Sequence, residues 1–157
     1  MIIATWGSIW QKTLVGKREN EMPEIEPDGF VYGPNDSGKK YKSLNYHRHM
    51  PRPGKTRWID LFTRDHEYEL FDTCDKNSWI CVDGNYWGTL DGKIRLGVSD
   101  ERFSFCPSNT NPLVPWHGYP VRGSGKDYQV PESILDAWLR DGIINNIIAK
   151  RIRSAKI

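Results

Sequence analysis

Two histidines, His47 and His49, stand two residues apart in a segment that also carries Arg52 and Lys55. An imidazole titrates near neutral pH, so one histidine can take a proton from a ribose 2′-hydroxyl while another donates a proton to the leaving oxygen. A neighbouring arginine or lysine stabilises the charge that develops on the phosphate. His117 lies in an aromatic segment that can complete a pocket. Together these five residues predict the catalytic set of a metal-independent ribonuclease.

The same two histidines also have the spacing of metal ligands, because alternate residues of an extended chain project from one face. The sequence specifies no position for a third ligand, so we expect neither a metal site nor a cofactor. Other catalytic motifs are missing from the sequence. The chain has no Gly-x-Ser-x-Gly nucleophile elbow, and residues 33–40 lack the spacing of a phosphate-binding loop.

A longer segment, residues 38–58, carries seven basic side chains and no acidic one. Lysine and arginine pair with phosphates, and the aromatic rings between them can stack on unpaired bases. Its proline and glycine residues indicate a loop or an irregular edge rather than a helix. We therefore predict a ligand-binding face made of Lys39, Lys40, Lys42, Tyr46, Arg48, Arg52, Lys55 and Arg57.

This charge distribution predicts a small binding module that engages a nucleic acid, a nucleotide or an acidic protein partner, and we favour it over an enzyme. The ribonuclease described above and a structural subunit of a larger assembly are the alternatives. The basic segment also has an interpretation that involves no ligand. It can be a solvated face, or it can neutralise residues 59–101, which carry four basic and ten acidic side chains.

The elements that must position these residues are expected to be strands followed by helices. Between residues 57 and 106, short apolar and aromatic runs alternate with turn signals, which predicts a twisted antiparallel β-meander. A hairpin around Arg64, Asp65 and His66 and a two-residue turn at Asp91–Gly92 would connect its strands. The strands are expected at 57–63, 67–73, 78–82, 86–90, 93–98 and 102–106, with a further short strand at 30–32.

Residues 131–157 show the pattern of a helical hairpin. Pro131 suits the first turn of a helix, and apolar residues follow it at helical spacing at Ile134, Leu135 and Trp138. A second helix is expected from about Asn145 to Ala155. We expect the two helices to cover one face of the meander, with Trp138 buried.

The remaining segments complete an α+β fold. Residues 107–130 are rich in proline, glycine and polar residues, which predicts a long ordered loop whose aromatic centre at 115–120 packs against the protein. Residues 1–56 are expected to form an irregular segment that wraps an edge of the sheet. A chain of 157 residues is most simply one domain, so we expect a single domain over 1–157.

Three cysteines, an odd number without a Cys-x-x-Cys pair, favour a reducing compartment over a disulfide framework. The first residues lack the basic start and the cleavage site of a signal peptide. No apolar run approaches the roughly 20 residues that a membrane helix needs. We therefore expect a cytoplasmic protein without membrane contact.

Overall fold

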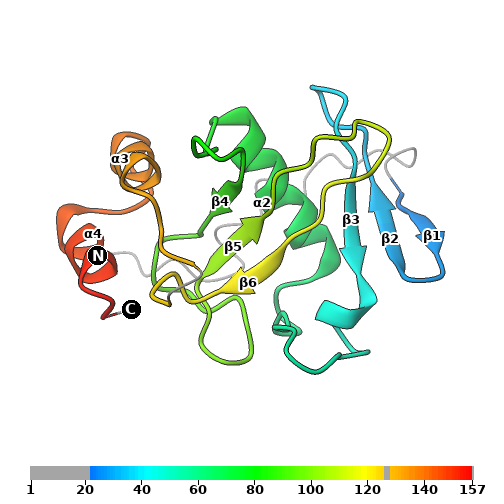
Figure 1. The fold of residues 1–157 in the computed structure, drawn as a ribbon, viewed down its shortest axis with the longest axis horizontal. Coiled ribbons are helices and arrows are strands. Elements are labelled where there is room, and N and C mark those ends of the chain that lie inside the picture. Colours follow the sequence, from blue (N-terminus) through cyan, green and yellow to red (C-terminus); the bar gives the residue numbers. More distant parts are fainter. Residues whose placement is uncertain (1–21, 126–127, 157) are drawn as a thin grey trace.

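The computed structural model describes residues 22–125 and 128–156. Within these residues the chain forms two antiparallel three-stranded sheets and three α-helices (Figure 1). The expected α+β class is confirmed. The expectations for residues 1–21, both the lack of a signal peptide and the first part of the wrapping segment, lie outside the described residues.

The first sheet lies in the amino-terminal part of the chain. It consists of β1 (Glu24–Glu26), β2 (Gly29–Tyr32) and β3 (Tyr41–Leu44), in that order. A two-residue turn at positions 27–28 joins β1 to β2. The strand expected at 30–32 is confirmed as part of β2, but the expectation that this whole part of the chain is irregular is wrong. Pro27, Gly33, Pro34 and Gly38 instead lie in the connections between its short strands.

The second sheet consists of β4 (Tyr86–Gly88), β5 (Phe103–Cys106) and β6 (Tyr119–Val121), again in chain order. A meander is therefore present, but its third strand lies beyond residue 106, in the segment expected to be a loop. Pro120 argues against a strand, yet it is tolerated here because β6 is an edge strand. The expected packing of residues 115–120 is confirmed at Pro120, which is fully buried.

Helix α2 (Arg64–Lys76) lies between the two sheets and packs against β3 and β4 (Figure 1). The hairpin expected around residues 64–66 is therefore wrong. Thr63 caps the helix, because its side chain accepts a hydrogen bond from the His66 N–H while the His66 side chain accepts one from the Thr63 N–H. Residues at helical spacing then form its buried face, namely Glu67, Leu70, Phe71 and Cys74.

Three other expected strands are also wrong. Residues 57–63, 78–82 and 93–98 contribute isolated bridges to their neighbours and form no strand. The turn at Asp91–Gly92 does not close a hairpin: Gly92 has a φ of +79°, and a Cβ added to it would lie 2.7 Å from Cγ2 of Ile148. This turn therefore leaves room for a helix from the end of the chain.

Both expected C-terminal helices are confirmed, as α3 (Glu132–Arg140) and α4 (Asn146–Arg153). Trp138 is fully buried, and its ring stacks on Phe103 of β5 with the ring centroids 5.7 Å apart. The two helices lie at the end of the molecule opposite the first sheet (Figure 1).

No helix in the described part of the chain is long and apolar enough to cross a membrane.

The three cysteines, Cys74, Cys81 and Cys106, are buried free thiols. Burial raises the pKa of the Cys106 thiol to about 12, so this side chain stays protonated and packs as a small apolar group.

Candidate functional site

Three of the basic residues expected to bind a ligand are paired inside the molecule. Lys39 Nζ lies 2.9 Å from Asp75 Oδ1, and Arg48 Nη2 lies 2.6 Å from Glu67 Oε2. Lys42 forms ion pairs with two acidic residues beside the first turn, Glu26 and Asp28. Asp75 and Glu67 belong to the acidic segment 59–101, so intramolecular neutralisation is confirmed for Lys39 and Arg48.

The Arg48–Glu67 pair is part of the core. Glu67 is buried and accepts hydrogen bonds from the Tyr41 hydroxyl at 2.8 Å, the Ser43 hydroxyl at 2.7 Å and Arg48 Nε at 2.7 Å. Burial raises the pKa of Glu67, and Arg48 is the strongest of the groups that oppose this rise. Arg48 thus compensates a buried carboxylate that joins α2 to the first sheet.

Lys40 is exposed but lies apart from the rest of the basic segment. It lines a hollow of about 260 Å³ between the turn at 37–40 and the loop at 109–116. Hydrogen bonds tie these two segments together, because Trp116 N–H donates to Lys40 O and Lys42 N–H donates to Trp116 O, at 2.8 and 2.7 Å. Lys40 therefore belongs to the junction between the two sheets.

The exposed basic residues that remain are Arg52, Lys55 and Arg57, which we call the basic ridge. They follow η2 (Asn45–His47), a short 3-10 helix, on a loop that contains two prolines and turns at Gly54 with a φ of +78°. The ring of Tyr46 lies beneath this loop, with Arg52 Cζ 4.6 Å and Lys55 Nζ 5.9 Å from its centroid. The expected irregular loop is therefore confirmed for the ridge.

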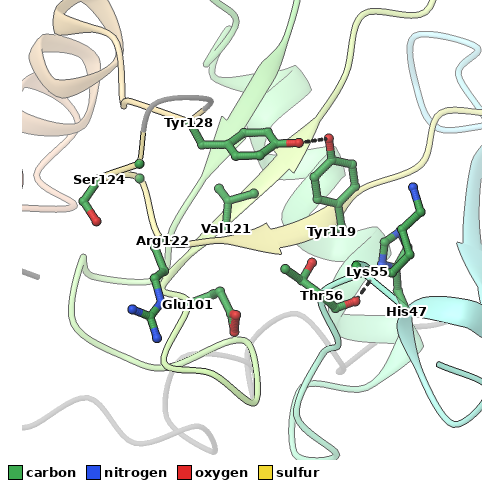
Figure 2. A pocket seen from close by; sticks show the side chains of 12 residues that line it. His47, Lys55, Thr56, Glu101, Tyr119, Val121, Arg122, Ser124 and Tyr128 are labelled. Atoms are coloured by element: carbon green, nitrogen blue, oxygen red, sulfur yellow. Dashed lines mark hydrogen bonds between the residues drawn. The ribbon is translucent and has the colours of Figure 1, made fainter. Parts of the chain in front are cut away.

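A cavity of about 540 Å³ opens between the basic ridge and β6, and we call it the ridge cavity. Lys55 and Arg122 lie on opposite sides of it (Figure 2). Tyr119 and Tyr128 form an aromatic wall, with their hydroxyl oxygens 2.8 Å apart. The other lining residues are His47, Gly54, Thr56, Glu101, Val121, Gly123, Ser124 and Gly125.

Glu101 is the acidic residue among those that line the ridge cavity. Its side chain is buried, and Oε1 accepts a hydrogen bond from the Ser99 N–H at 2.8 Å. Arg122 is held nearby, because Nε and Nη2 both donate to Ser99 O. Glu101 is thus engaged by the backbone of the turn at 97–101, whereas Lys55 and Arg122 are exposed.

His47 is buried at the edge of the ridge cavity. Its Nδ1 lies 2.7 Å from Thr56 O, and because a carbonyl oxygen can only accept, Nδ1 carries a proton (Figure 2). The ring stacks on Tyr119 with the ring centroids 5.2 Å apart. Burial, and then the nearby charges of His117 and Lys55, lower the pKa of His47 to about 4 against the opposing hydrogen bond to Thr56. His47 is therefore neutral at pH 7.

The structure places the other two candidate histidines differently. His117 is half-buried, and burial followed by the charge of Lys55 lowers its pKa. It lies close enough to His47 for their charges to interact. His49 is exposed and does not line the ridge cavity. The expectation that His47 and His49 share one face of an extended chain is wrong, because η2 ends at His47 and the chain turns after it.

Eight of the twelve described residues that line the ridge cavity lie outside the basic segment that the sequence analysis singled out. Seven of them lie in or near β6, and Glu101 precedes β5. The segment 122–125 combines an arginine with two glycines, which is a weak signal for a binding loop. Tyr119 and Tyr128 carry no local signal, because only the fold brings them to His47.

The described residues contain no group of three or more histidine, cysteine or acidic side chains that could hold a metal ion.

Comparisons with known proteins identify no relative of this chain: no protein family, no curated protein and no solved structure matches it.

Proposed function

We propose that the protein is a small cytoplasmic binding module for single-stranded nucleic acid, with one nucleotide held in the ridge cavity. The observation that carries the proposal is the cavity itself, which has exposed cations on opposite sides and an aromatic wall. Its volume of about 540 Å³ lies within the range of roughly 300–1,000 Å³ that is typical of sites for small ligands.

The chemistry of the lining matches the parts of a nucleotide. Lys55 and Arg122 can pair with phosphate oxygens, and an arginine can do so through two parallel hydrogen bonds. Tyr128 offers apolar surface to a base, and the hydroxyl groups of Tyr119 and Tyr128 can bond to its edge. Gly125 is exposed and nothing lies within 4 Å of the position where its side chain would be, so a ligand can approach the backbone there.

A polymer fits this surface better than a single nucleotide. The segment 54–56 also forms one wall of a second hollow, of about 380 Å³, which Arg57 lines. Arg52 lies above the ring of Tyr46, which Lys55 also approaches. A strand that crosses the segment 54–56 would therefore meet Lys55 at the ridge cavity and Arg57 at the second hollow, and successive cations suit the backbone of a single-stranded nucleic acid.

An acidic protein partner is less well matched to this site. Aspartate and glutamate side chains would pair with the basic ridge but leave the ridge cavity without an occupant.

The three unpaired thiols support a reducing compartment such as the cytoplasm.

Binding of a short fluorescent single-stranded RNA, followed by anisotropy, tests the proposal. Lys55→Glu should weaken binding by about tenfold or more and reduce the slope of log K against log salt by about one. Lys93→Glu makes the same change in net charge at an exposed residue that lines neither hollow, so it should bind like the wild type.

Three outcomes would contradict the proposal. The first is no binding of the RNA at low salt, the second is equal weakening of binding by the two charge reversals, and the third is competition by an acidic peptide that matches competition by unlabelled RNA. The last result would identify an acidic protein as the partner.

A further inference from the structure

One oxygen of the Glu101 carboxylate has no hydrogen-bond partner in the part of the chain that the structure describes. Glu101 is only 3% exposed and lines the ridge cavity. Its Oε1 accepts a hydrogen bond from the Ser99 N–H at 2.8 Å, whereas Oε2 has neither a hydrogen bond nor an ion pair within residues 22–125 and 128–156. A buried carboxylate oxygen is costly to leave without a donor. A ligand that displaces water from this cavity therefore has to supply a donor to Oε2.

The turn at 97–101 holds this carboxylate in place. The N–H groups of Leu96 and Gly97 donate to Glu101 O at 2.7 and 3.0 Å, which fixes the backbone of the residue. Gly97 also leaves room for the side chain, because a Cβ at this position would collide with Glu101 Oε1. Arg122 secures the same turn by donating to Ser99 O. Glu101 Oε2 is thus a positioned acceptor.

Glu101 lies at the divide between two hollows. It lines both the ridge cavity and the second hollow of about 380 Å³, as does the segment 54–56. Figure 2 shows its carboxylate pointing away from Arg122 and toward Thr56. A strand that runs from one hollow to the other passes over this divide, while its base lies against the aromatic wall. The part of the strand that faces Glu101 is therefore its sugar–phosphate backbone.

The backbone of a nucleic acid has few groups that can satisfy a carboxylate oxygen. Its phosphates are negatively charged acceptors, and the ether oxygens of the sugar also only accept. Within a strand, the 2′-hydroxyl of ribose is the backbone group that donates, and DNA lacks it. An acid at this place therefore favours one class of nucleic acid over the other.

We propose that the ridge cavity selects RNA over single-stranded DNA, with Glu101 Oε2 accepting a hydrogen bond from a ribose 2′-hydroxyl. This inference rests on the proposed function, because a nucleic acid must first occupy the ridge cavity. A hydrogen bond to a charged acceptor is stronger than one between neutral groups, and DNA would leave Oε2 buried without a donor. DNA should therefore bind about tenfold or more weakly than RNA.

The wild-type test uses three labelled strands of one sequence, composed of adenine and cytosine so that their bases are identical. They are RNA, DNA and a 2′-fluoro RNA, in which fluorine replaces each 2′-hydroxyl and cannot donate. Anisotropy measures their affinities at one salt concentration. RNA should bind about tenfold or more tightly than either of the other two strands.

Glu101→Gln tests the residue itself. Its amide oxygen can still accept from the Ser99 N–H, but the second, charged acceptor is gone. The ratio of RNA to DNA affinity should fall to about threefold or less, because DNA no longer leaves a carboxylate unpaired. Glu24→Gln makes the same substitution at an exposed residue that lines neither hollow, and it should keep the wild-type ratio. A role of Glu101 in the fold alone would weaken RNA and DNA equally and leave the ratio unchanged.

Four results would overturn this inference while leaving the binding module in place. They are equal binding of RNA and DNA by the wild type, binding of 2′-fluoro RNA as tight as that of RNA, an unchanged ratio in Glu101→Gln, and an equal fall of the ratio in Glu24→Gln. Absence of binding by all three strands at low salt would instead overturn the proposed function itself.

Discussion

Arg48 illustrates how a residue that suits a phosphate can serve the core instead. Its guanidinium and the Glu67 carboxylate are both buried, and Tyr41 and Ser43 supply the other hydrogen bonds to that carboxylate. A buried pair is strongly destabilising when one partner is removed, because the other charge is left uncompensated. Arg48 thus stabilises the fold through its contact with Glu67.

Replacing Arg48 by alanine should lower the free energy of unfolding by about 3–5 kcal/mol, because it leaves Glu67 buried and unpaired. Chemical denaturation with urea measures the change. The double variant Arg48→Met, Glu67→Leu removes both charges and should recover most of the loss. A single variant as stable as the wild type would show that the pair is not the buried unit described above.

Asp75 gives the molecule a pH-dependent contact between α2 and the turn after β2. Burial alone would raise the pKa of Asp75, but the hydrogen bonds it receives outweigh burial and lower it to about 2. Their donors are Ser37, Tyr86, Lys39 and Asn35. Because the folded-state pKa lies below the ordinary value of 3.8, the stabilisation is complete above about pH 4 and is lost as the pH falls toward 2.

Asp75→Asn should therefore be less stable than the wild type at pH 6, and the difference should shrink as the pH falls from about 4 to 2. Urea denaturation at several pH values measures this difference. Asp83→Asn, at an exposed residue, provides the matched control and should follow the wild type at every pH. A constant difference between Asp75→Asn and the wild type down to pH 2 would contradict the assigned role.

At the scale of elements, α2 is the main departure from the fold expected from the sequence. Residues 57–73 contain aromatic and β-branched residues that favour strands, but they contain no glycine or proline where the expected hairpin must turn. The Thr63 cap and the helical spacing of Glu67, Leu70, Phe71 and Cys74 were signals for the observed helix. Burial of this face between two sheets outweighs the local preference for strands.

The C-terminal helices were predictable because α3 has a proline and a glycine at its ends, and α2 lacks both of these signals. Pro131 and Gly142 mark the ends of α3, and its apolar residues recur with one clear period. By contrast, β6 could not be predicted, since it has three residues and a proline at its centre. It forms because β5 offers it a partner, which is a tertiary effect that a local pattern does not contain.

Trp138 is the anchor of α3 on the second sheet. It is fully buried and contacts the rings of both Phe103 and Trp79. Trp138→Ala should lower the free energy of unfolding by about 3–5 kcal/mol, because a large buried ring leaves a cavity behind. Ile147→Ala on α4 is the matched control, since Ile147 is exposed and its truncation should have little effect. Equal effects of the two substitutions would argue against the packing of α3 described above.

In the whole molecule, the fold separates the basic segment into charges that are paired internally and charges that remain exposed. Its net charge of +7 was visible in the sequence, but the sequence did not show which charges would be paired internally. Folding brings Asp75 and Glu67 of α2 to Lys39 and Arg48, and it leaves the basic ridge exposed beside β6. The basic segment contributes four of the twelve described residues that line the ridge cavity, so about a third of the candidate site was predictable.

Amide chemical shifts mapped during titration with a short single-stranded RNA show whether the proposed nucleic-acid site is the ridge cavity. We expect the largest changes at residues 54–56 and 119–125, which face one another across the cavity. Residues 109–114, beside the separate hollow that Lys40 lines, should change little. Changes centred on that hollow, or no changes at the cavity under saturating RNA, would contradict binding in the ridge cavity.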